Sequence, residues 1–120
     1  MARITVQVTM CIQDSQEFGS DDEHMVSRVF YSLAVDGVEK GDFHSDIKQT
    51  VGSEIGMIEV YPPVGYNGPL DYQKFRDKIA DYYNSLVGPG GSAIGLGPSA
   101  KNIRMRNNTI RKPHRFELEV

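Results

Sequence analysis

The sequence predicts an α+β domain, an antiparallel sheet of about six strands with one main helix packed on a face. Three observations indicate this class. Apolar and polar residues alternate over residues 3–12, Asp36-Gly37 separates two strand-like runs, and helically spaced apolar residues occur once, between about residues 70 and 87. The expected order is β-β-β-β-α-β-β. Because 120 residues suit one hydrophobic core, we expect a single domain over 1–120.

The first strand is expected over residues 3–12, where one face would be apolar and Cys11 would lie on the polar face. Its apolar positions are Ile4, Val6, Val8, Met10 and Ile12. The segment from Gln13 to His24 is rich in Asp, Ser and Glu, which predicts an exposed loop. Residues 25–35 carry apolar side chains on both faces, as a strand in the middle of a sheet would.

Asp36-Gly37 predicts a tight hairpin turn that leads into a strand over residues 38–51. That strand would place Phe43, Ile47 and Val51 on one face and polar residues on the other. A fourth strand, roughly 55–61, should end at Pro62-Pro63, because proline cannot donate to the ladder.

The helix is expected to begin near Pro69 and to end before Gly88-Pro89. Its core positions would be Phe75, Ile79, Leu86 and either Tyr82 or Tyr83, since only one of two adjacent residues can face the core squarely.

Two final strands are expected near residues 103–108 and 115–120. A hairpin between them would place Arg104 opposite Glu119 and Arg106 opposite Glu117, with opposite charges at both positions.

One helix is too narrow to cover such a sheet, because a helix is ~10 Å across and strands lie ~4.8 Å apart. Long loops, a strongly curled sheet or a second copy of the chain would have to cover the rest. We expect the last of these, a homo-oligomer.

The composition excludes several classes of protein. A single cysteine forms no internal disulfide, and no apolar run approaches the ~20 residues of a membrane span, so we expect a cytoplasmic protein without a membrane partner. The 13 basic and 16 acidic residues give a net charge of −3, which does not favour nucleic acid as a partner. The charge is uneven: residues 1–60 sum to −7 and residues 61–120 to +4. The basic half is either a binding face or the complement of the acidic half.

The glycine-rich stretch 88–100 is the first candidate site. Backbone amides at Gly90 and Gly91 could approach a phosphate or carboxylate while Lys101, Arg104 or Arg106 supplies positive charge. The stretch follows a helix and precedes a strand, unlike a P-loop or a dinucleotide-binding turn. The alternative is a helix C-cap followed by a flexible connection.

Three further groups have weaker functional readings. Asp42, His44 and Asp46 share a strand face and could bind a metal ion, but any solvated strand face looks similar, and we expect neither a metal nor a cofactor. Cys11 has no neighbouring base in the sequence and is expected to be an inert thiol. Tyr61 and Tyr66 flank the prolines and would line either an aromatic pocket or an ordinary packing contact.

These observations favour a small homo-oligomeric binding or assembly module, with a ligand site formed by Tyr61, Tyr66 and the glycine-rich stretch. One alternative is an enzyme acting on a small anionic substrate, a phosphate or carboxylate, with Lys101, Arg104 and Arg106 on the anion and Asp42, His44 or Asp46 as acid or base. A second alternative is a nucleic-acid accessory protein that uses the same basic residues.

Overall fold

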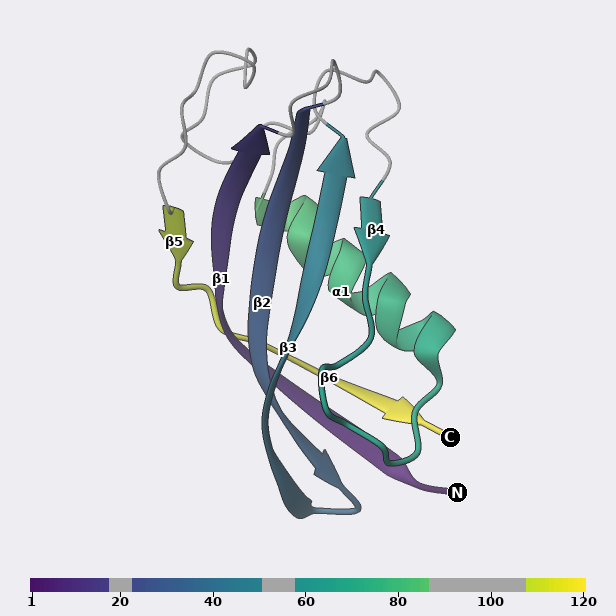
Figure 1. Cartoon of the computed structure of the whole chain (residues 1–120). Helices are drawn as coiled ribbons and strands as arrows, with labels where there is room; N and C mark the ends of the chain where they lie inside the picture. Colours follow the sequence, from purple (N-terminus) through teal and green to yellow (C-terminus); the bar gives the residue numbers. More distant parts are fainter. Residues whose placement is uncertain (18–22, 51–57, 87–107) are drawn as a thin grey trace.

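The computed structural model describes residues 1–17, 23–50, 58–86 and 108–120, and it confirms the expected α+β class (Figure 1). A six-stranded antiparallel sheet carries one helix, in the predicted order. The elements are β1 (Arg3–Glu17), β2 (Glu23–Val35), β3 (Val38–Thr50), β4 (Ile58–Val60), α1 (Tyr72–Leu86), β5 (Asn108–Ile110) and β6 (His114–Glu119).

The sheet order is β4-β3-β2-β1-β5, and β6 also pairs with β1. The ladder between β1 and β2 is longer than predicted. Residues from Gln13 to Glu17 pair with Glu23 to Ser27, so the expected loop between Gln13 and His24 is wrong at both ends. Backbone pairing does not require apolar side chains, and a polar segment can therefore extend a ladder that apolar residues begin.

A β-bulge at Thr9 reverses the faces of β1. The register passes from Val8 opposite Tyr31 to Met10 opposite Phe30, which leaves Thr9 as the extra residue. Its hydroxyl donates to the Phe30 carbonyl over 3.2 Å. The buried positions are therefore Ile4, Val6, Val8, Cys11 and Gln13. The predicted exposure of Cys11 is wrong for this reason.

The predicted C-terminal hairpin is also wrong. Both β5 and β6 pair antiparallel with β1, so they run in the same direction along one side of it. Glu119 lies opposite Arg3, and Glu117 lies opposite Thr5. The break between β5 and β6 contains Pro113, which has no N–H for a ladder, and it lies beside the bulge in β1. Arg104 and Arg106 lie outside the described residues.

Helix α1 begins at Tyr72 because Asp71 caps it. The Asp71 carboxylate accepts a hydrogen bond from the Lys74 backbone N–H at 3.2 Å. Pro69 therefore precedes the helix instead of occupying its first turn. The buried residues of the helix are Phe75, Ile79, Tyr82, Tyr83 and Leu86.

Both tyrosines of the adjacent pair are buried, contrary to the prediction of one. The ring of Tyr82 stacks on His114 of β6 at a centroid distance of 5.8 Å. The hydroxyl of Tyr83 meets Gln13 of β1 and Ser27 of β2. A curved sheet surrounds a wider arc of the helix than a flat sheet does, so adjacent helix positions can both be buried.

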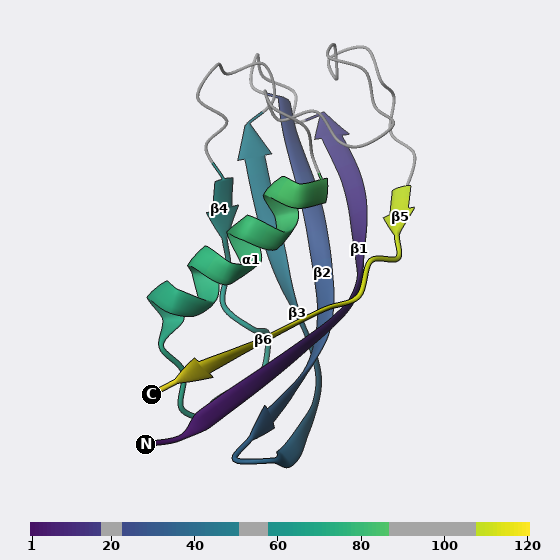
Figure 2. The ribbon, with the colours of Figure 1, turned by 180° about the vertical axis from the view of Figure 1, so that it is seen from behind.

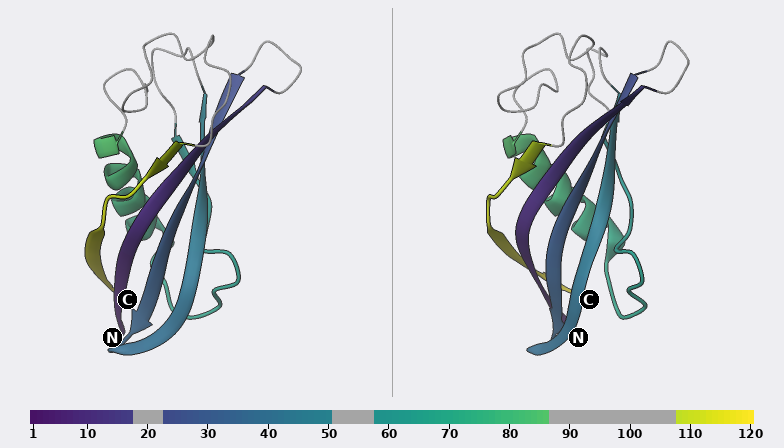
Figure 3. Two further views of the ribbon diagram at one scale, coloured as in Figure 1. Left: turned by 90° about the vertical axis from the view of Figure 1, so that its left-hand side faces the viewer. Right: turned by 60° about the vertical axis from the view of Figure 1, so that its left-hand side comes forward.

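The helix crosses the sheet diagonally on its concave side (Figure 2). The sheet curves around the helix, and the two termini lie side by side (Figure 3), joined by two hydrogen bonds between Ala2 and Val120. We call the side under α1 the inner face and the opposite side of β1, β2 and β3 the outer face. No described element covers the outer face. None of the helical structure in the described residues could span a membrane.

Candidate functional site

The outer face is centred on Phe30 of β2. Met10 lies directly opposite it on β1 and His44 on β3, with the Phe30 and His44 rings 6.0 Å apart. Ile12 extends the apolar surface along β1. These four side chains are half-buried within the subunit, although α1, the helix of the described residues, lies on the other face. The arrangement is an apolar strip on an open sheet face.

An ion pair borders this strip. Arg28 donates to both carboxylate oxygens of Asp46, at 2.8 Å and 3.3 Å. This bidentate contact raises the pKa of Arg28. Because Arg28 holds Asp46, the Asp42, His44 and Asp46 set is not a free group of metal ligands. Among the residues that the structure describes, no three His, Cys, Asp or Glu side chains are grouped to hold a metal ion.

The two tyrosines of the predicted ligand site have different surroundings. Tyr66 packs edge-on against Phe43 at 5.4 Å and donates from its hydroxyl to the Pro69 carbonyl at 2.8 Å. A Cβ atom at Gly68 would come within 3 Å of the Tyr66 ring, so a larger residue there would have to displace this ring. Tyr61 is 42% exposed. Tyr66 thus packs within its own loop and Tyr61 is exposed, and a ligand at either residue stays a prediction from the sequence.

The remaining residues of the predicted anion site are Gly90, Gly91, Lys101, Arg104 and Arg106, and all lie outside the described residues. An anionic ligand, an enzymatic activity towards one and a nucleic-acid partner stay predictions from the sequence.

A surface hollow of about 580 Å³ lies where the N-terminus, the Asp36-Gly37 turn and β6 meet. It is lined by Met1, Ala2, Arg3, Thr5, Asp36, Gly37, Arg115, Glu117 and Glu119. Two arginines and three acidic side chains make its charge mixed, which does not suit a dedicated anion site. Sequence reasoning missed this hollow because it depends on the pairing of β6 with β1.

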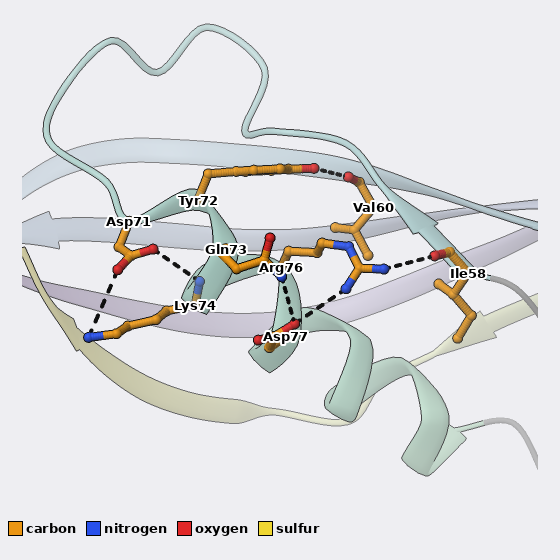
Figure 4. A network of polar contacts seen from close by, with 8 residues as sticks. All are labelled: Ile58, Val60, Asp71, Tyr72, Gln73, Lys74, Arg76 and Asp77. Atoms are coloured by element: carbon orange, nitrogen blue, oxygen red, sulfur yellow. Dashed lines mark hydrogen bonds and ion pairs between the residues drawn. The ribbon is translucent and has the colours of Figure 1, made fainter.

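The opposite edge of the sheet is closed by the helix (Figure 4). The Tyr72 hydroxyl donates to the Val60 carbonyl, and the Arg76 guanidinium donates to the Ile58 carbonyl at 3.3 Å. Arg76 also contacts Asp77, which accepts a hydrogen bond from Gln73. Helix side chains therefore donate hydrogen bonds to the carbonyl groups that β4 directs away from β3.

Buried titratable groups lie on the inner face. Burial raises the pKa of the Cys11 thiol from 9.0 to about 12 and that of Tyr82 from 10.0 to about 12. Burial also raises the pKa values of Tyr31 and Tyr83. A thiol held protonated is a poor nucleophile, which agrees with the inert Cys11 predicted from the sequence.

The pKa values predict alkaline destabilisation. Above pH 9 the Cys11 thiol ionises in the unfolded chain but stays protonated in the fold, so the unfolded chain binds fewer protons. The contribution of the Cys11 thiol to the free energy of unfolding should therefore be constant below pH 9 and should fall between pH 9 and 12. Urea denaturation at intervals of pH measures this decline, and Cys11→Ala should make it shallower. An equal slope in the variant would contradict a role for the thiol.

Comparison of the chain with protein-family models, curated proteins and solved structures finds no match. The described fold and surface place it in the class of α+β proteins that have a helix on one face of an antiparallel sheet and an open opposite face.

Proposed function

We propose that the protein is a small homo-oligomeric binding or assembly module and that its outer face contacts a second copy of the chain. The observation that carries this proposal is the open apolar strip of Phe30, Met10 and Ile12. Covering this strip would remove apolar surface from water, which is worth about 25 cal/mol for each Å².

A second copy suits this face because its charges are mixed. Arg28 and Lys48 lie among Asp42 and Asp46 on the same side of β2 and β3. In a two-fold contact the same patch supplies both surfaces, so a patch with both signs can place each charge near its opposite. A partner of one dominant charge would leave half of these groups unmatched.

The test replaces Phe30 with glutamate. Wild-type protein at micromolar concentration should sediment as a dimer or larger species, and Phe30→Glu should weaken self-association at this face by at least about tenfold, because a carboxylate would be buried among apolar side chains. Analytical ultracentrifugation over a concentration series measures the dissociation constant. Circular dichroism checks that the variant folds.

Lys78→Glu is the control, since Lys78 is an exposed residue of α1, which lies on the inner face and away from the strip. It should associate as wild type does. Wild-type protein that stays monomeric at high micromolar concentration would contradict the proposed function.

A further inference from the structure

The two edges of the sheet differ in how their backbone groups are satisfied. Tyr61 N–H donates to the Asp46 carbonyl, which sets the alternation along β4 and turns the groups of Ile58 and Val60 away from β3. Tyr72 and Arg76 then bind both of these carbonyls. The β4 edge is thus protected by the helix.

The β6 edge lacks such protection from any element of the described ranges. Ala2 and Val120 exchange two hydrogen bonds, so Leu118, Phe116 and His114 also direct their backbone groups to β1. The N–H and C=O groups of the intervening residues Arg115, Glu117 and Glu119 point away from the sheet. No hydrogen bond joins these groups to any residue of the described ranges. An unpaired row of this kind is a template for another strand.

We propose that β6 pairs antiparallel with β6 of a second copy about a two-fold axis beside Phe116, which joins the two sheets into one. Arg115 then lies opposite Glu117 of the partner subunit, and Glu117 lies opposite Arg115 of the partner subunit. Phe116 lies opposite Phe116 of the partner subunit on the inner side.

The backbone alternation agrees with this register. Arg115 and Glu117 both direct their N–H and C=O groups outwards, so each becomes a hydrogen-bonded pair with its counterpart and four ladder bonds form. Phe116, whose groups are already bonded to β1, occupies a non-hydrogen-bonded position, where side chains lie closest.

Side-chain direction and charge distinguish this register from its neighbours. A shift by one residue would place outer-side residues against inner-side residues. A two-residue shift in one direction places Arg115 against itself, and like charges directly opposite one another destabilise a sheet. The opposite shift places Glu117 against itself but Arg115 opposite Glu119 of the partner subunit. In that register Glu117→Arg would exchange one like-charged pair for another and would not weaken association, so this variant distinguishes the two registers.

The two side chains are available for this contact. The side chains of Arg115 and Glu117 are 63% and 46% exposed. A guanidinium nitrogen of Arg115 lies 3.4 Å from a carboxylate oxygen of Glu117 in the same strand. An ion pair so exposed contributes little to stability, so exchanging it for the same pair across the interface costs little.

This edge contact goes beyond the proposed function because it uses a different surface from the outer face. Two two-fold contacts at different surfaces generate an assembly larger than a dimer, which is a closed tetramer where the two axes cross at right angles, whereas either contact alone gives a dimer. The variants of each surface therefore report on that surface separately.

The experiment exchanges the charges. Arg115→Glu places acids opposite acids across the edge, and Glu117→Arg places bases opposite bases. Each single variant should weaken edge association by at least about tenfold. An equimolar mixture of the two should associate again, because acidic residues on one copy then face basic residues on the other. The double variant R115E/E117R should also associate.

Sedimentation velocity at low salt is the measurement, and recovery on mixing shows that both single variants are folded. Asp81→Arg, at an exposed position of α1, makes the same change of charge and should associate as wild type does. Single variants that associate normally, or a mixture that does not recover, would overturn the edge contact. If that occurs while Phe30→Glu still dissociates the protein, the proposed function stands without the edge. If Phe30→Glu has no effect while the charge exchange behaves as expected, the edge alone is the interface.

Discussion

Replacing Phe75 with alanine is expected to lower the free energy of unfolding by about 3–5 kcal/mol, the range typical of a buried aromatic residue cut back to a methyl group. Phe75 is fully buried and connects three elements. From α1 its ring meets Tyr31 of β2 edge-on at 5.6 Å and Phe116 of β6 at 6.3 Å. The truncation therefore removes the aromatic contact between the helix and both sides of the curved sheet. Urea denaturation of wild type and variant measures the loss.

Phe43→Ala is the control for this prediction. Phe43 is only half-buried and packs on Tyr66 in the loop before the helix, so its removal should cost clearly less. A Phe75→Ala variant that loses under about 1 kcal/mol would show that the core repacks around the gap, contrary to a rigid contact among the three rings.

Local patterns predicted most of the fold. The Asp36-Gly37 turn is an example, because a tight hairpin needs two residues at positive φ, and these residues adopt 50° and 80°. The same holds for residues 25–35, where apolar side chains on both faces predicted a central strand. Phe30, on the less buried of those faces, now marks the outer strip.

The alternation of apolar and polar residues did not predict the bulge at Thr9. Met10, Cys11 and Ile12 are all apolar, so the sequence does not reveal where the alternation changes phase. The consequence extends to the polar residue Gln13, which the bulge turns towards the helix. A one-residue insertion therefore moved both a thiol and an amide to the inner face.

The sequence also did not predict which strand pairs with the final strand. Opposite charges favoured Arg104 and Arg106 as partners of the final strand, but Arg3 from the first strand lies opposite Glu119. Charge alternation identifies a compatible partner without specifying which segment supplies it. The mixed hollow and the open β6 edge both depend on this pairing, so neither was visible from local sequence.

The hydroxyl of Tyr83 is the centre of a buried polar cluster. Ser27 donates to it at 3.1 Å and Gln13 at 3.3 Å, and all three side chains are buried between α1 and the sheet. A buried donor without an acceptor costs about 1–3 kcal/mol. The cluster therefore depends on the tyrosine oxygen more than on the ring that carries it.

Tyr83→Phe is expected to lower the free energy of unfolding by about 1–3 kcal/mol, because the ring stays while the shared acceptor is lost. Chemical denaturation measures the change. Tyr82→Phe is the matched control, since the Tyr82 hydroxyl donates at 2.7 Å to the carbonyl of exposed Lys112, where water can replace it. Adding Ser27→Ala to Tyr83→Phe should recover part of the loss, because the Ser27 hydroxyl that loses its acceptor is then removed. Equal costs for the two tyrosine variants would contradict the buried cluster as the source of the effect.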